Sequence, residues 1–217
     1  MNVQELYTKF GFKLYTKGVY NLNLFGVRRE SAIPNKFDDI ICIACNTESG
    51  WLTWAIPATT DAGSSVLNAD FGGLGGTATL PASTVKGGMQ YKFKWGTHKG
   101  KYPAFQQAEP FRLVRDSDKN GVNLTTTEIQ ELLNAGSISE GYFGINIHHA
   151  SSIGVSNNVD NWSWGCQVIQ SIHDWQKFTS IVERSVSIYG DVVTYTLFNE
   201  VDLGMSIDEF YNKMNGR

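Results

Sequence analysis

Residues 142–170, YFGINIHHASSIGVSNNVDNWSWGCQVIQ, contain the pattern that decides how this chain folds. Apolar and polar side chains alternate over residues 142–148, and this alternation predicts a β-strand. Asn146 and His148 share one face of that strand, whereas His149 continues the other face. That other face is apolar and comprises Phe143, Ile145 and Ile147. We therefore expect His148, rather than His149, to face a functional site.

The second half of this stretch predicts a loop followed by another strand. Residues 151–161 are rich in Ser, Asn and Gly, and an apolar pair at residues 168–169 follows Cys166. A loop that returns to the same sheet would bring the thiol of Cys166 beside the imidazole of His148. An imidazole within hydrogen-bonding reach is the commonest means of making a nucleophilic thiolate near neutral pH. The sequence thus predicts a cysteine–histidine site.

At these residues the chain resembles the L,D-transpeptidase family, the cysteine enzymes that process the peptide stems of peptidoglycan. The family pattern is a His, usually followed by a small residue, then a loop, then Ser-His-Gly-Cys. Here the pattern appears as His148-His149, the loop 150–162 and Ser163-Trp164-Gly165-Cys166, with the His-to-Cys spacing of the family.

The resemblance implies a role for each matching residue. Cys166 is the expected nucleophile, His148 its base, and His149 the residue whose carbonyl or side chain orients that base. Ser163 and Gly165 are expected to frame the oxyanion region. Glycine lets the backbone approach closely, so the amides around Gly165 and Cys166 are the candidates for an oxyanion hole.

Two positions differ from the family pattern. Trp164 stands where the family usually has a second His, and Val168 stands where it usually has an Arg two residues after the Cys. An Arg is a natural partner for a substrate carboxylate. Without it, we expect hydrolysis slightly ahead of transpeptidation.

A closer similarity is to a divergent branch of phages and phage-derived bacterial genes, which shows a run like GINIH followed by WSxGCQV. Upstream segments at residues 58–63, 98–102 and 115–116 are also similar, and the similarity covers residues 50–170. It implies a compact, endolysin-like enzyme that acts on the cell wall at phage entry or lysis.

Four residues near the motif are expected to bind substrate. Trp162 and Trp164 flank the motif and would form a wall against a glycan or a stem peptide, although packing explains them equally well. Asn146 lies on the face of His148. His98 would line the cleft, with an ordinary turn residue as the alternative.

The resemblance implies an enzyme that forms a thioester with a stem peptide and then resolves it by hydrolysis or by L,D-transpeptidation. The alternative from another class is a non-catalytic virion or cell-wall-binding protein that uses the same fold as a scaffold. A carbohydrate-binding module is a third possibility. A zinc site needs three or four converging ligands at short spacings, and no zinc signature is present, so we expect no metal and no cofactor.

Composition limits the choice of partner and compartment. The 217 residues, 41% of them hydrophobic, fit one catalytic-type domain over residues 1–217, with residues 1–25 as a possible N-terminal lead. The net charge of −3 without a basic block predicts no nucleic-acid partner, and the lack of a long apolar run predicts no membrane span. No secretory signal is evident, so we expect release by lysis or transport on a phage particle. One mild basic cluster is expected to be solvated: Lys92, Lys94, Lys99 and Lys101.

The rest of the chain predicts mostly strands and turns. We expect an α+β domain that is predominantly β, an L,D-transpeptidase-like β-sandwich or partly open barrel with a few short helices. Strands are predicted over residues 19–27, 40–44, 52–56, 77–80, 89–95, 111–115, 142–148 and 192–198. Helices are predicted over residues 172–186 and after Ser206, with Glu209 as its capping-box partner. The glycine-rich run 71–76 predicts a flexible turn.

Two further motifs have an ordinary structural interpretation. Cys42 and Cys45 lie in an apolar run that predicts a buried strand, with the two thiols on opposite faces. Residues 116–121, DSDKNG, have the oxygen ligands and the turn glycine of a calcium loop, but the closing acid is displaced by one position to Glu128. An Asx turn that leads into a short helix is the simpler interpretation.

Overall fold

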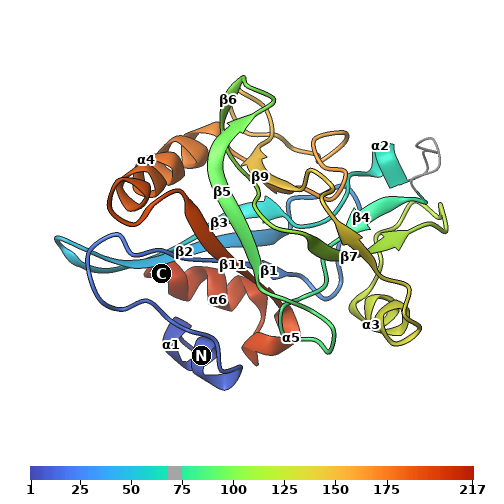
Figure 1. Ribbon diagram of the computed structural model, residues 1–217, viewed down its shortest axis with the longest axis horizontal. Helices are drawn as coiled ribbons and strands as arrows, with labels where there is room; N and C mark the ends of the chain where they lie inside the picture. Colours follow the sequence, from blue (N-terminus) through green and yellow to red (C-terminus); the bar gives the residue numbers. More distant parts are fainter. Residues whose placement is uncertain (68–74) are drawn as a thin grey trace.

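Eight strands close into a barrel in the computed structural model of the chain, which describes residues 1–67 and 75–217 (Figure 1). Around the barrel the order is β1 (Asn23–Arg28), β11 (Val192–Asn199), β5 (Tyr91–His98), β6 (Tyr102–Gln107), β9 (Asn146–His149), β10 (Gln167–Ile169), β3 (Gly50–Thr59) and β2 (Asp39–Thr47). A second, three-stranded sheet consists of β4 (Thr77–Thr79), β7 (Phe111–Asp116) and β8 (Ser139–Gly141). The predicted class, α+β and predominantly β, is confirmed. The barrel is closed, however, so neither the sandwich nor the partly open barrel is correct.

Short helices and one long helix surround the strands. They are α1 (Val3–Lys9), α2 (Ser64–Leu67), α3 (Thr126–Asn134), α4 (Ile172–Tyr189), α5 (Glu200–Leu203) and α6 (Ile207–Met214). The helix predicted over residues 172–186 is α4, which continues to Tyr189 and stops at Gly190, where φ is +89°. Ser206 caps α6 in a reciprocal capping box with Glu209, as predicted. No helix in the described residues combines the length and the apolar character that crossing a membrane requires.

The barrel wall separates two hydrophobic clusters because side chains alternate along each strand. Every barrel strand contributes to the inner cluster, and α4 adds Trp175, Phe178 and Val182 to it. The outer cluster lies between the wall and the terminal helices α1 and α6, which are at the bottom of Figure 1. Cys45 belongs to the inner cluster and Cys42 to the outer one, so the predicted burial of these thiols on opposite faces is confirmed.

The sequence predictions need correction at two strands and at one helix. Residues 142–148 do not form one strand, because Gly144 has a φ of +72° and only Asn146–His149 pair as β9. Strand β6 was not expected, since Pro103 weakens a strand prediction; it is tolerated because β9 pairs with β6 only at Phe105 and Gln106. The helix α1 was not expected either. Of the predicted glycine turn at 71–76, residues 71–74 lie outside the described residues, and Gly75 and Gly76 have positive φ.

The segment 116–121 is a turn before a helix, as the simpler interpretation predicted. Asp118 Oδ1 accepts a hydrogen bond from the Asn120 amide at 3.1 Å, which is an Asx turn. Helix α3 then begins after Thr125, and the Glu128 carboxylate accepts hydrogen bonds from the Thr125 amide and hydroxyl. Glu128 therefore caps a helix rather than closing a calcium loop.

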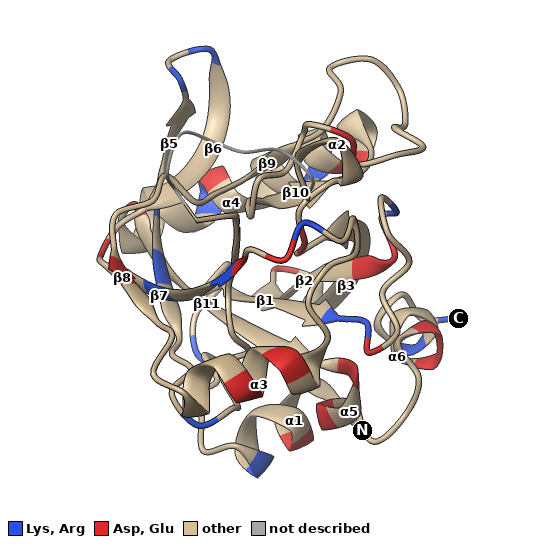
Figure 2. Cartoon of the chain, turned by 90° about the vertical axis from the view of Figure 1, so that its right-hand side faces the viewer, with Lys and Arg blue, Asp and Glu red and all other residues tan. Residues whose placement is uncertain are grey.

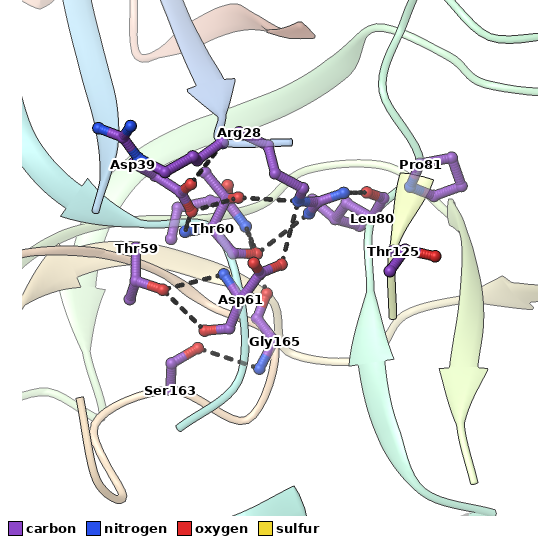
Figure 3. A network of polar contacts seen from close by, with 12 residues as sticks. Arg28, Asp39, Thr59, Thr60, Asp61, Leu80, Pro81, Thr125, Ser163 and Gly165 are labelled. Carbon is purple, nitrogen blue, oxygen red and sulfur yellow. Dashed lines mark hydrogen bonds and ion pairs between the residues drawn. The ribbon is translucent and has the colours of Figure 1, made fainter. Parts of the chain in front are cut away.

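A buried arginine connects the barrel to the segment that follows β3 (Figure 3). Arg28, only 1% exposed, places Nε 3.0 Å from Asp61 Oδ1 and donates from Nη1 to the Leu80 carbonyl at 2.9 Å. Its Nε–H points at Thr60 Oγ1, which in turn donates to Asp39 Oδ2 at 2.8 Å. The network therefore joins the ends of β1 and β3 to the start of β2 and to the residue after β4.

Removing one partner of this ion pair is expected to be costly, because an unpaired charge would stay buried. We expect Asp61→Ala to lower the free energy of unfolding by about 3–5 kcal/mol in urea denaturation. The matched control is Asp208→Ala, which removes the exposed partner of Arg29 at 2.7 Å and should cost less than about 1 kcal/mol. Equal losses in the two variants would contradict the role given to Arg28 and Asp61.

Candidate active site

A hollow of about 450 Å³ lies beside the ends of β5, β6, β9 and β10. It brings together six of the residues singled out in the sequence: His98, Asn146, His148, Trp162, Trp164 and Cys166. The three other predicted site residues, His149, Ser163 and Gly165, are buried and do not line it.

The pairing of β9 with β10 explains why the cysteine and the histidine share this hollow. The two strands are parallel, with Val168 beside His148 and Gln167 beside Ile147. Ile147 belongs to the inner cluster of the barrel. Successive side chains of a strand point to opposite faces, so its neighbour His148, and Val168 beside it, point outward. Cys166 comes one residue before β10 and two residues before Val168, so its side chain points to the same face as Val168. This places the thiol on the side of His148.

A single hydrogen bond fixes the protonation of His148. Its Nδ1 lies 2.7 Å from the carbonyl oxygen of His149, and a carbonyl oxygen can only accept, so Nδ1 carries the proton. In the neutral ring Nε2 is then free of a proton and can act as a base. Burial lowers the pKa of His148 to about 4, and the charges of His98 and Lys99 act in the same direction, so the ring is neutral at pH 7.

His149 lies behind the site rather than in it. Its ring packs against Tyr102 and Trp175, with centroids 4.3 Å and 5.7 Å away. Its Nδ1 is 3.2 Å from the carbonyl oxygens of both Ala150 and Ser151. The contribution of His149 to the hollow is therefore its main-chain carbonyl, which holds the ring of His148.

The thiol of Cys166 is held by the backbone of the preceding strand. Its sulfur accepts from the Asn146 amide at 3.4 Å and donates to the Gly144 carbonyl at 3.8 Å, and no hydrogen bond joins it to His148. Burial raises the pKa of the thiol to about 11, although the Asn146 amide and the charge of Lys99 act against this rise. The hollow thus contains a neutral thiol and a neutral imidazole, not a thiolate–imidazolium pair.

Ser163 and Gly165 shape the turn that presents the thiol (Figure 3). Ser163 Oγ accepts from the Gly165 amide at 3.2 Å and donates to the Cys166 carbonyl at 2.8 Å. Gly165 has a φ of +122°, and a Cβ there would overlap the carbonyl oxygen of Ala78. Because the Gly165 amide is already engaged, it is not a free oxyanion donor. The Cys166 amide is the candidate that remains from the predicted pair.

Aromatic rings form the walls of the hollow. The His98 ring lies 4.7 Å from the His148 ring, and its Nδ1 is 3.3 Å from the side-chain amide nitrogen of Asn146. His98 is therefore a residue of the site and not only of a turn. Trp162 and Trp164 expose 40% and 47% of their surface, which leaves both indoles accessible to a ligand.

Sequence analysis missed four residues that line the hollow: Lys99, Tyr102, Gly144 and Asn161. Residues 98–102 form one of the segments whose resemblance to the phage-associated branch is noted in the sequence, and this resemblance was the available signal for Lys99 and Tyr102. The four lysines of the basic cluster are exposed, as expected, and Lys99 in addition lines the hollow. Spacing along the chain does not show where the tip of a hairpin lies.

The described residues contain no set of side chains that could bind zinc. No three side chains of His, Cys, Asp or Glu among them converge on one point that could hold a metal ion.

Comparison with known proteins identifies no protein similar to this chain. No protein-family model, no curated protein and no solved structure matches this chain.

The neutral state of Cys166 predicts a particular pH profile for its alkylation. Since only the thiolate reacts, we expect the rate of modification by iodoacetamide to rise about tenfold per pH unit from about pH 7 to about pH 10, without a plateau. Mass spectrometry of the adduct separates Cys166 from the buried Cys42 and Cys45. A plateau that begins below about pH 8 would show that the resting thiol is already ionised.

The turn at Gly165 predicts a steric penalty. We expect Gly165→Ala to lower the free energy of unfolding by more than about 2 kcal/mol, because strain at positive φ adds to the overlap with Ala78. Gly154 is the control, since its φ is +66° and nothing lies near the position of an added Cβ. Gly154→Ala should cost only about 1 kcal/mol, the ordinary strain of that conformation. Similar losses at both positions would refute the close packing of the thiol turn.

Proposed function

We propose that the hollow is the active site of a cysteine acyl-transfer enzyme that acts on peptidoglycan stem peptides. The observation that supports this most directly is that a cysteine and a histidine side chain line the same hollow. Cys166 and His148 line one hollow, and the hydrogen bond to the His149 carbonyl leaves Nε2 of His148 as the basic nitrogen. A nucleophile, a base and a group that orients the base are the parts that such catalysis needs.

The proposed reaction begins when Nε2 of His148 takes the proton of the Cys166 thiol as the sulfur attacks a stem-peptide carbonyl carbon. The backbone amide of Cys166 stabilises the oxyanion that forms. The C–N bond then breaks, the leaving amine takes the proton from the imidazolium, and a thioester remains. Water or an acceptor amine attacks the thioester, gives its proton to His148 and releases the product, after which the proton returns to the thiol.

A neutral resting pair is consistent with this sequence of steps. The pKa of the thiol is raised and the pKa of His148 is lowered, both by burial, so the ion pair is disfavoured in the hollow. Proton transfer must then accompany attack on the carbonyl, which is general base catalysis rather than attack by a preformed thiolate.

The same proposal extends to the fold, the outcome and the setting of the reaction. We assign the barrel to an L,D-transpeptidase-like fold of the phage-associated branch. Val168 is fully buried, so no side chain at that position can bind a donor carboxylate, and we favour hydrolysis over transpeptidation. In a phage setting the enzyme would reach the cell wall after lysis or as part of a particle.

A non-catalytic protein of the cell wall or virion is the second candidate. The raised pKa of the Cys166 thiol favours it, because such a thiol is unreactive at neutral pH. The exposed indoles of Trp162 and Trp164 favour it too, since flat aromatic surfaces suit a glycan. This candidate predicts binding to peptidoglycan that survives Cys166→Ala.

Incubation with purified muropeptides, analysed by mass spectrometry, tests the enzyme. We expect loss of a terminal residue, cleavage of cross-links or new cross-links with the wild-type chain and none with Cys166→Ala. His148→Ala should lower the rate by about 100-fold or more. The matched control His173→Ala removes an exposed imidazole on α4 and should retain full activity.

The opposite result is equally informative. No change in any muropeptide, with the thiol kept reduced and several stem types supplied, would contradict the enzyme. Binding to peptidoglycan that persists in Cys166→Ala would then support the non-catalytic candidate.

A further inference from the structure

The hollow contains one cation that no part of the proposed reaction uses. Lys99 lines it together with Cys166 and His148. The positive charge of Lys99 lowers the pKa of Cys166 and also the pKa of His148, so its field reaches both reacting groups. Lys101, two residues further on, does not line the hollow, and its charge lowers the pKa of His98.

Nothing acidic among the described lining residues opposes this cation. His98 and His148 both have a lowered pKa, chiefly through burial, and are neutral at pH 7. Figure 2 shows blue and no red at the tip of the β5–β6 hairpin, where Lys99 lies. The field at the thiol is therefore that of an uncompensated positive charge, which favours an anion.

The hairpin fixes the position of this cation. The Lys101 amide donates to the His98 carbonyl at 2.9 Å, and both central residues of that turn have positive φ, +51° at Lys99 and +72° at Gly100. Such turns prefer Asn, Asp or Gly at their first central position. A lysine there is unfavourable for the turn itself, so local folding does not explain its presence.

Lys99 comes from a different part of the fold than Val168, the position where the family pattern has an Arg. Val168 of β10 is buried beside His148, whereas Lys99 extends from the turn between β5 and β6. A ligand in the hollow would thus meet a positive charge from the hairpin and not from β10.

We propose that Lys99 makes the hollow selective for ligands that bear a carboxylate close to the carbon attacked by Cys166. For stem peptides, an inference that rests on the proposed function, this means a donor whose carboxylate near the scissile carbonyl is free rather than amidated. Lys99 is then the residue that determines specificity, while Cys166 and His148 perform the chemistry.

Two alkylating agents of similar size test the selectivity without any assumption about catalysis. Iodoacetate has a carboxylate next to the attacked carbon, and iodoacetamide has a neutral amide there. We expect Lys99→Gln to lower the ratio of the iodoacetate rate to the iodoacetamide rate at Cys166 by about threefold or more, and Lys99→Arg to preserve it. Lys101→Gln, on the same hairpin, should leave the ratio nearly unchanged. A ratio that Lys99→Gln does not alter, or that Lys101→Gln lowers equally, overturns the assignment.

Muropeptides with a free or an amidated carboxylate next to the scissile bond extend the test to substrate. We expect Lys99→Gln to lower kcat/KM for the free acid about tenfold and to leave kcat/KM for the amide within about twofold. Turnover of both forms with equal efficiency by the wild type would refute the substrate preference while leaving the enzyme intact. If neither form is turned over, the proposed function fails, and the alkylation ratio still decides whether Lys99 selects an anion.

Discussion

The buried pairing of Arg28 with Asp61 is the constraint on which the rest of the site depends. A guanidinium removed from water must be surrounded by acceptors, and the chain supplies Asp61, Thr60 and the Leu80 carbonyl for it. These groups hold the segment after β3 in one conformation. The thiol turn is attached to the same segment, because the Gly63 amide donates to the Ser163 carbonyl at 3.0 Å. A side chain deep in the barrel wall thus sets the position of the turn that presents Cys166.

One residue links the barrel interior to Cys166. Gln167 follows Cys166 and is fully buried; its Oε1 accepts from the Tyr195 hydroxyl at 2.9 Å, and its Nε2 lies 3.4 Å from the Thr60 carbonyl. Because successive side chains on a strand point to opposite faces, fixing Gln167 inward fixes Cys166 outward. The period of two that lets the barrel pack its core also aims the thiol at the hollow.

Local patterns predicted well what depends on periodicity, and poorly what depends on distant contacts. The alternation around His148 correctly separated the buried Ile147 from the residues that line the hollow, and the capping residues Ser206 and Glu209 marked the last helix. Closure of the barrel was not predictable, because it depends on the parallel pairing of β1 with β11, two strands that lie near opposite ends of the sequence. Lys99 was missed for a similar reason: the pairing of β5 with β6 places it at the hollow, and Pro103 obscured β6 in the sequence.

In our proposal, the neutral pair and the lysine together determine which ligands react. A preformed thiolate would react with many electrophiles, whereas burial of Cys166 and His148 keeps both groups neutral. The proposed reaction then requires a ligand that stays in the hollow long enough for proton transfer and attack to occur together. Lys99 is the one formal charge among the described lining residues, and we infer that it favours an anion there. Burial and charge thus act in opposite directions in this hollow: desolvation raises the pKa of the thiol, whereas the exposed Lys99 lowers it.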